Sequence, residues 1–206
     1  MNNYFDDRDF TDYVHDKLAV PIIYEQLQWK PDIINIDYAN KRDMSDGIDY
    51  QATDDMGFKI TIQERFRDEF YKNYNDFTIR YTRSNSKTPQ ERKSEFFKIS
   101  ATHFLYGITN GKKFLDKRDT LTDFVKYIVI DVSVLKKLFR VGIIKVPENC
   151  SSKSRIAIEN GKKILYTAKR KNNDGSSEFI GIDPSLLKEV LRDKIDDLVI
   201  LQRGFY

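Results

Sequence analysis

The segment that decides the fold is residues 47–66, which read GIDYQATDDMGFKITIQERF. Apolar and polar residues alternate over 47–53 and again over 58–63, and the turn-forming residues DDMG separate the two runs. Alternation with a period of two is typical of a strand that buries one face, and two such runs around a short turn predict a β-hairpin.

The alternation also predicts which side chains share a face of this hairpin, because a shift of one residue would expose the whole apolar set. The predicted buried face consists of Ile48, Tyr50, Ala52, Phe58, Ile60 and Ile62. Asp49 then lies on the opposite face, together with Lys59, Gln63 and Arg65. Glu64 points with the apolar set.

Working outward, helices and strands are mixed along the whole chain. Residues 7–28 have apolar side chains near helical spacing, with Pro21 expected to kink or divide the helix. We expect further strands at 32–37, 77–82, 103–108 and 125–131 and near Ile156 and Ile164, and helices over 89–99 (capped by Thr88), over 132–141 and from Asp183 onward.

This order predicts an α/β fold in which helices flank a mixed central sheet of four to six strands. We expect a single domain over residues 1–206, with a core at about 8–142 and a small C-terminal extension at about 143–206.

Composition narrows the functional classes. The 206 residues are 40% hydrophobic and 33% charged, which excludes a disordered or fibrous chain. The acidic N-terminus and the lack of a long apolar run predict a cytoplasmic protein with no membrane contact. One cysteine and two histidines exclude a disulfide framework and make a structural zinc site improbable, so a metal would be bound by oxygen.

Charge is unevenly distributed. Residues 1–50 carry 5 basic and 11 acidic side chains, whereas residues 51–150 carry 19 and 13. Basic side chains alternate with aromatic ones over 65–98, a pattern that can follow a phosphate backbone, although an ordinary solvated surface also explains it. The candidate nucleic-acid-binding residues are Arg67, Arg80, Arg83, Lys87, Arg92 and Lys93.

The order helix, strand, hairpin with a carboxylate, strand ending in Gln63-Glu64-Arg65, then helix and strand, resembles the PD-(D/E)XK nuclease superfamily. Its pattern has an acid on the second core strand and an acid or glutamine, one residue, then lysine on the third. Asp49 and Gln63-Glu64-Arg65 match this pattern, in the restriction-endonuclease-like variant with glutamine as second ligand. Residues 98–106 also resemble the junction of core helix and next strand, so the resemblance covers about residues 8–142.

The resemblance implies an endonuclease that hydrolyses DNA with Mg²⁺ or Mn²⁺. Asp49 and Gln63 would hold the metal, with Glu64 as an alternative if a bulge turns it round. Glu25 on the first helix would contribute through water. Arg65 replaces the lysine of the pattern and cannot act as a base, so either Arg65 or Lys59 would stabilise the phosphate.

Two alternatives to the endonuclease stay open. The first is the same scaffold without catalysis, which would bind nucleic acid or a protein, and Arg65 favours it. The second is a protein inhibitor or structural accessory without nucleic-acid contact. Double-strand cleavage would favour a two-fold homodimer. The small size and the Asn-, Lys- and Ile-rich composition suggest a phage or mobile-element origin.

Overall fold

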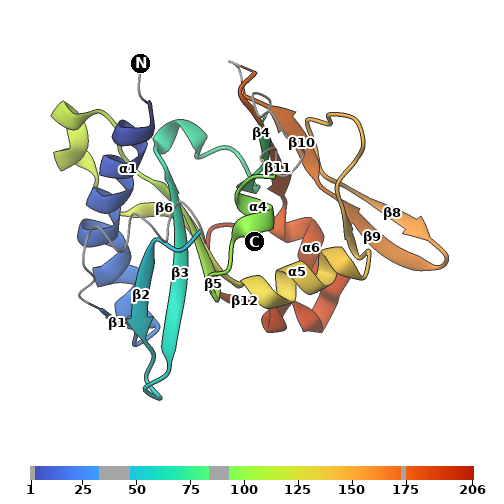
Figure 1. Ribbon diagram of the computed structural model, residues 1–206, viewed down its shortest axis with the longest axis horizontal. Coiled ribbons are helices and arrows are strands. Elements are labelled where there is room, and N and C mark those ends of the chain that lie inside the picture. Colours follow the sequence, from blue (N-terminus) through green and yellow to red (C-terminus); the bar gives the residue numbers. More distant parts are fainter. Residues whose placement is uncertain (1–2, 33–46, 84–92, 173–174) are drawn as a thin grey trace. The chain divides into compact units, whose positions relative to one another are not determined.

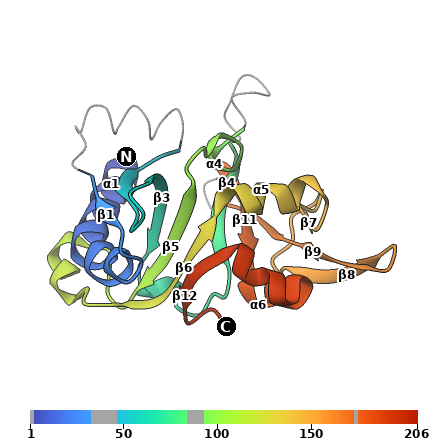
Figure 2. The ribbon, with the colours of Figure 1, turned by 90° about the horizontal axis from the view of Figure 1, so that it is seen from below.

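The computed structural model describes residues 3–32, 47–83, 93–172 and 175–206 (Figures 1 and 2). Over these residues the chain is a mixed α/β structure, with one six-stranded mixed sheet and two three-stranded sheets. The predicted α/β class with a mixed central sheet is therefore confirmed. The predicted strand at 32–37 lies almost entirely outside the described residues.

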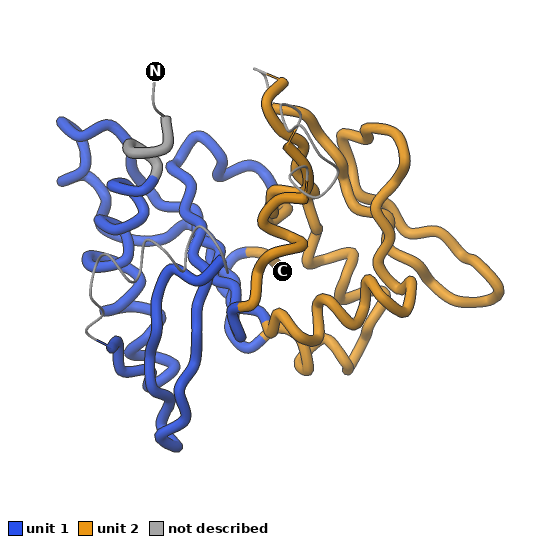
Figure 3. Tube along the Cα trace, viewed as in Figure 1, with its two compact units in different colours: residues 1–74, 101–130, 200–204 blue, residues 75–100, 131–199, 205–206 orange. Residues whose placement is uncertain are grey.

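The described chain divides into two compact units, each built from three separate segments (Figure 3). Unit 1 contains residues 1–74, 101–130 and 200–204, and unit 2 contains residues 75–100, 131–199 and 205–206. The divisions fall after residues 74, 100, 130, 199 and 204.

Unit 1 is built on the six-stranded sheet. Figure 2 shows its later strands side by side. The order across the sheet is β1 (Lys30–Pro31), β2 (Tyr50–Thr53), β3 (Lys59–Arg67), β5 (His103–Thr109), β6 (Phe124–Asp131) and β12 (Val199–Arg203). β2 pairs antiparallel with β3, and β3 pairs parallel with β5. A parallel pair requires a crossover connection, and here the chain passes through unit 2 between the two strands.

The hairpin register follows the predicted alternation. Tyr50 pairs with Ile62 and Ala52 with Ile60, and Ile48, Ala52, Ile60 and Ile62 are buried. The expectation was wrong for Phe58, whose side chain is 64% exposed. Phe58 belongs to the turn, because its amide and carbonyl both bond to Asp54.

The long N-terminal helix lies along one face of this sheet (Figure 1). It begins as α1 (Asn3–Val14) and continues as the π-helical η1 (His15–Tyr24), which contains Pro21. Proline cannot donate the backbone hydrogen bond of a regular α-helix. The helix therefore changes to the π-helical hydrogen-bond pattern in the segment around Pro21, where a kink was expected. Apolar side chains of the helix pack on the sheet: Phe10, Val14, Leu18, Ala19 and Ile23.

Two short 3₁₀ helices complete unit 1. They are η2 (Glu69–Tyr71), directly after β3, and η3 (Leu115–Thr120), before β6.

Unit 2 holds the two small sheets. β4 (Phe77–Arg83) pairs with β11 (Ser177–Ile182), and β11 with β10 (Ala168–Lys171). The other sheet has the order β7 (Ile144–Lys145), β9 (Lys162–Tyr166), β8 (Arg155–Glu159). The strand predicted at 77–82 therefore exists, but it pairs with a strand about a hundred residues away in sequence.

The helices of unit 2 are α4 (Glu95–Lys98), α5 (Val132–Arg140), α6 (Pro184–Leu191) and the 3₁₀ helix η4 (Arg192–Asp197). The predicted helices at 132–141 and from Asp183 are confirmed, and Asp131 and Asp183 cap them with their side chains. Gly142 follows α5 with a φ of 75°, a conformation that glycine adopts without strain.

The helix predicted over 89–99 is much shorter where the chain is described. Its expected start, Thr88, lies outside the described residues. Lys93 instead forms a β-bridge with Thr82, and the Ser94 amide bonds to the Tyr81 carbonyl. The helix begins only at Glu95, because pairing with β4 holds the preceding residues extended. No helix in the described part of the chain is long and apolar enough to cross a membrane.

Candidate functional site

Asp49 lies immediately before β2, and its buried carboxylate takes three hydrogen bonds from other parts of unit 1. Oδ2 accepts from the main-chain amide of Glu64 at 2.7 Å and from Nε2 of Gln63 at 2.5 Å. Oδ1 accepts from Nη1 of Arg8, on α1, at 3.2 Å. The Asp49 side chain thus takes the place of a strand carbonyl opposite Glu64, which holds the carboxylate against β3.

The amide of Gln63 is in an unusual position. Its Nε2 lies 2.5 Å from Oδ2 of Asp49 and 3.5 Å from the main-chain oxygen of Glu64, so two oxygens converge on one nitrogen. Its Oε1 is buried and has no hydrogen-bond partner in the described residues. A buried acceptor without a partner costs about 1–3 kcal/mol, and such a group needs a functional or structural explanation.

The Glu64 side chain leaves β3 on the opposite face, toward the N-terminal helix, as its register predicted. Its Oε1 accepts from the Tyr24 hydroxyl at 2.7 Å, and its Oε2 lies 3.0 Å from Nδ1 of His15. The Tyr50 ring stacks on the His15 ring, and its hydroxyl donates to Asp12 at 2.5 Å. The Glu64 carboxylate is therefore used within the helix–sheet interface, and its metal-ligand role would need a bulge that β3 does not have at this position.

Burial and the Glu64 carboxylate set the protonation of this network. Burial lowers the pKa of His15, but the negative charge of Glu64 and its hydrogen bond act against this, and the net shift is upward from 6.5. Burial and Glu64 raise the pKa of Tyr24 well above its usual range, so its hydroxyl keeps the proton that it donates. The network holds Glu64, and with it the neighbouring Gln63 backbone, in one position.

The other residues proposed from sequence lie at different distances from Asp49. Arg65 lies two positions after Gln63 on β3 and therefore on the same face. Lys59 shares that face but lies four residues earlier, about 13 Å along the strand, and forms an ion pair with Asp32 at 2.7 Å. The structure does not bring Lys59 to Asp49 or Gln63.

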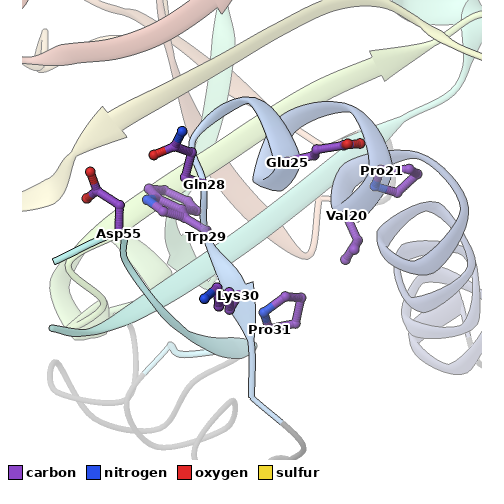
Figure 4. Close-up of a pocket in the computed structure, with 8 residues that line it drawn as sticks. All are labelled: Val20, Pro21, Glu25, Gln28, Trp29, Lys30, Pro31 and Asp55. Carbon is purple, nitrogen blue, oxygen red and sulfur yellow. The ribbon is translucent and has the colours of Figure 1, made fainter. Parts of the chain in front are cut away.

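Glu25 lies in a different place. Its side chain is exposed and lines a pocket of about 710 Å³ beside the hairpin turn (Figure 4). The pocket walls also include Trp29 and, from the turn, Asp55. Of the helix residues, Arg8 contacts Asp49, and His15 and Tyr24 contact the Glu64 side chain on the other face of β3.

Sequence reasoning missed these three helix residues, although Arg8 carried a signal. It is the only lysine or arginine among the first sixteen residues, in a stretch with five aspartates. A single such cation within so acidic a helix start has a carboxylate partner at hand, but the sequence does not say which one.

A divalent cation is compatible with part of this arrangement. Carboxylate, amide and carbonyl oxygens suit Mg²⁺ and Mn²⁺, and Asp49, Oε1 of Gln63 and the main-chain oxygen of Glu64 supply one of each. The Gln63 amide nitrogen now lies between two of these oxygens, at a point that would also suit a cation. Within the described residues, no three His, Cys, Asp or Glu side chains are grouped as metal ligands. Asp37, Asp43 and Asp46, three further carboxylates that precede Asp49 in the sequence, lie outside those residues.

The candidate nucleic-acid-binding residues are divided between the units. Arg67, at the end of β3, belongs to unit 1, whereas Arg80, Arg83 and Lys93 belong to unit 2. Lys87 and Arg92 lie outside the described residues. Comparisons with protein families, with curated proteins and with solved structures found no match to this chain.

Proposed function

We propose that this chain is a Mg²⁺- or Mn²⁺-dependent endonuclease that hydrolyses phosphodiester bonds in DNA. One observation carries the proposal: a buried carboxylate, a main-chain carbonyl and an amide whose oxygen has no hydrogen-bond partner in the described part of the chain converge at the junction of β2 and β3. The order of elements predicted from the sequence around these residues resembles the PD-(D/E)XK nucleases.

In this function Asp49, Gln63 and the carbonyl of Glu64 would hold the cation. The cation would relieve negative charge at the phosphate and lower the pKa of the attacking water. The chain's own residues have separate roles. Arg8 orients the Asp49 carboxylate through Oδ1, and the His15 and Tyr24 contacts keep the Glu64 side chain on the far face, so that only its carbonyl is offered. Arg65 would neutralise the phosphate.

A second function has its own support. Arg8 already provides a positive charge at Asp49, and the motif position of lysine is occupied by Arg65. Both features favour a catalytically inactive module of the same scaffold that binds nucleic acid or a protein partner.

A cleavage assay combined with a binding assay distinguishes the nuclease from the inactive module. The full chain is incubated with plasmid, linear duplex and single-stranded DNA, with Mg²⁺ or Mn²⁺, alongside Asp49→Asn. Asp49→Asn keeps an acceptor for the Glu64 amide but removes the charge. Asp55→Asn, which removes a carboxylate from the exposed turn of the same hairpin, is the matched control.

Cleavage by the wild type and by Asp55→Asn, but not by Asp49→Asn, supports the nuclease. DNA binding that survives EDTA and Asp49→Asn, with no cleavage of any of the substrates, supports the inactive module.

A further inference from the structure

Three aromatic side chains lie exposed in a short segment that follows β3. Phe70, Tyr71 and Tyr74 are 74%, 36% and 45% exposed. Their rings form a chain, with centroids 5.3 Å apart for Phe70 and Tyr71 and 5.9 Å for Tyr71 and Tyr74. We call these three side chains the aromatic patch. Apolar groups gathered on a surface in this way mark an interaction site more often than single exposed residues do.

The backbone under the aromatic patch is held by hydrogen bonds. The Asp68 carboxylate accepts from the Phe70 amide at 3.2 Å, and the Glu69 amide donates to the Gly111 carbonyl at 3.0 Å. The amide of Tyr74 donates to the carbonyl of Tyr71 at 3.0 Å. The rings are therefore presented by an ordered turn, which lowers the entropy lost when a ligand binds.

Positive charge surrounds the rings. The guanidinium of Arg67 lies 5.3 Å from the centre of the Tyr71 ring, and Nζ of Lys126 lies 3.0 Å from the Tyr74 carbonyl. Lys72 is exposed within the patch, and the loop bonded to Glu69 continues into two further lysines, Lys112 and Lys113. The same segment carries only two anionic side chains, Asp68 and Glu69, beside these five cations. The surface suits a ligand that offers flat rings and negative charge together.

The aromatic patch follows β3, the strand that also carries Gln63 of the candidate site. Gln63, Arg65 and Arg67 lie on one face of β3, because they alternate along the strand. Arg67 is about 13 Å beyond Gln63 and already contacts the Tyr71 ring. A chain with regularly spaced phosphates could thus pass along β3 from Gln63 to the aromatic patch.

From this geometry we infer that the aromatic patch stacks unpaired bases of single-stranded nucleic acid, with the surrounding lysine and arginine side chains on its phosphates. Every base has a flat face that an aromatic ring can stack on, whereas in a duplex those faces are already covered by neighbouring bases. The inference that the candidate site acts on single-stranded nucleic acid, or on duplex with unpaired bases, rests on the proposed function. The inference that the aromatic patch binds unpaired bases does not depend on that function.

The test measures fluorescence anisotropy of labelled 20-nucleotide probes with the full chain in EDTA, so that cleavage cannot interfere. The probes are single-stranded DNA, single-stranded RNA, a blunt DNA duplex, and a DNA of the same length with a central run of abasic sites. The comparison of single-stranded DNA with single-stranded RNA shows which of these two nucleic acids supplies the unpaired bases. The abasic probe keeps the phosphates and removes the rings.

We expect single strands to bind more tightly than the duplex, and the abasic probe to bind about ten-fold more weakly than intact single-stranded DNA. Phe70→Ala and Tyr71→Ala should each weaken single-strand binding about ten-fold, and Tyr71→Phe should keep it. Phe58→Ala, which removes another exposed ring (64%) from the hairpin turn, should have no effect. Unchanged circular dichroism of each variant shows that the fold is retained.

Equal affinity for duplex and single strand, or for intact and abasic DNA, would overturn the inference, as would folded Phe70→Ala and Tyr71→Ala proteins that bind normally. Binding of a protein instead of nucleic acid by the patch would do the same. Failure of the proposed function looks different: base-dependent binding would persist in EDTA while no probe is cleaved in Mg²⁺ or Mn²⁺.

Discussion

Under the proposed function, Gln63 would prepare the cation site before the cation binds. Its Nε2 donates to Asp49 where two oxygens would otherwise repel each other, and its Oε1 has no hydrogen-bond partner among the residues that the structure describes. Rotation of the amide would exchange these atoms, so one residue can serve as hydrogen-bond donor in the free protein and as oxygen ligand in the loaded one. The two states differ in which atom meets Asp49.

The first prediction concerns metal uptake by Gln63 variants. Gln63→Met keeps the size but removes the ligand oxygen, and Mn²⁺ binding measured by calorimetry should weaken at least ten-fold. Gln63→Glu adds a charged ligand beside Asp49, and the affinity should rise by a similar factor, because hard cations favour carboxylates. Mn²⁺ should also raise the melting temperature of Gln63→Glu more than that of the wild type.

Asp55→Asn serves as the matched control and should bind Mn²⁺ like the wild type. The same affinity in Gln63→Met, Gln63→Glu and the wild type would show that this amide is no ligand.

The second prediction concerns the buried hydroxyl of Tyr24. Tyr24→Phe leaves one oxygen of the buried Glu64 carboxylate without its donor at 2.7 Å. The free energy of unfolding in urea should fall by about 1–3 kcal/mol, because a buried acceptor loses its partner and water does not replace it. Tyr166→Phe deletes a hydroxyl that donates to Glu159 at a half-buried position, where water can replace it, and should change stability less. Equal losses from the two variants would contradict a special cost of burial at Glu64.

At the scale of elements, the hairpin was predictable and its surroundings were not. Local alternation and one turn determine which face of β2 and β3 is buried, so the meeting of Asp49 and Gln63 followed from sequence. The Arg8 contact to Asp49 joins residues 41 positions apart, and no local pattern states which helix residue reaches which strand. Likewise β4 has the composition of a strand, but only the tertiary fold shows that β11 is its partner.

Gly107, in the middle of β5, illustrates a packing constraint between elements and provides the third prediction. A Cβ on Gly107 would lie 2.6 Å from the Phe124 ring and 3.0 Å from the Phe66 ring. Gly107→Ala should therefore lower the free energy of unfolding by about 1–3 kcal/mol through overpacking. Phe124→Leu makes room, so the double variant should lose less than the sum of the two single variants in urea unfolding. If the losses in unfolding free energy of the two single variants add up exactly in the double variant, the Phe124 ring does not limit the size of the side chain at residue 107.

The fourth prediction concerns pH and the sheet of β4, β11 and β10. Asp76, just before β4, forms an ion pair with Arg170 of β10 at 2.8 Å, and it lies against Gly181 of β11. Burial raises the pKa of Asp76, and Arg170 offsets only part of the increase, so the net shift is upward from 3.8. A raised acid pKa means that the folded state holds this proton more tightly than the unfolded chain does. The charged form therefore costs stability at neutral pH, and the cost disappears as pH falls through the raised pKa toward 3.8.

The measurement compares the wild type with Asp76→Asn, which carries no charge at any pH. As pH is lowered from 7 toward 4, the wild type should gain stability relative to Asp76→Asn, by at most about 1.4 kcal/mol per pH unit for one proton. A difference in unfolding free energy that stays constant, or that moves the other way, would contradict the upward shift.

At the scale of the whole molecule, the path of the chain limits how it can be divided. Each unit consists of three segments, and the chain passes from one unit to the other between them. The sequence resemblance ends near residue 142, and the sequence predicted a single domain with a core at about 8–142 and a small C-terminal extension. In the structure, residues beyond 142 supply β12 to the sheet of unit 1, and in unit 2 they supply β11, which pairs with β4, and β10, which pairs with β11.

The last prediction follows from this path: a fragment of residues 1–142 should not fold cooperatively. Without residues 143–206, β6 loses β12 as its neighbour, and β4 loses β11, so two strands carry unpaired backbone groups beside exposed apolar surface. The fragment should lack near-ultraviolet circular dichroism and a sigmoidal urea transition, both of which the full chain should show. Residues 143–206 supplied as a second polypeptide should restore these signals, because the missing strands return without a covalent link. A fragment 1–142 that unfolds in a sharp transition by itself would mean that the core is independent and that the interleaved path contributes little to its stability.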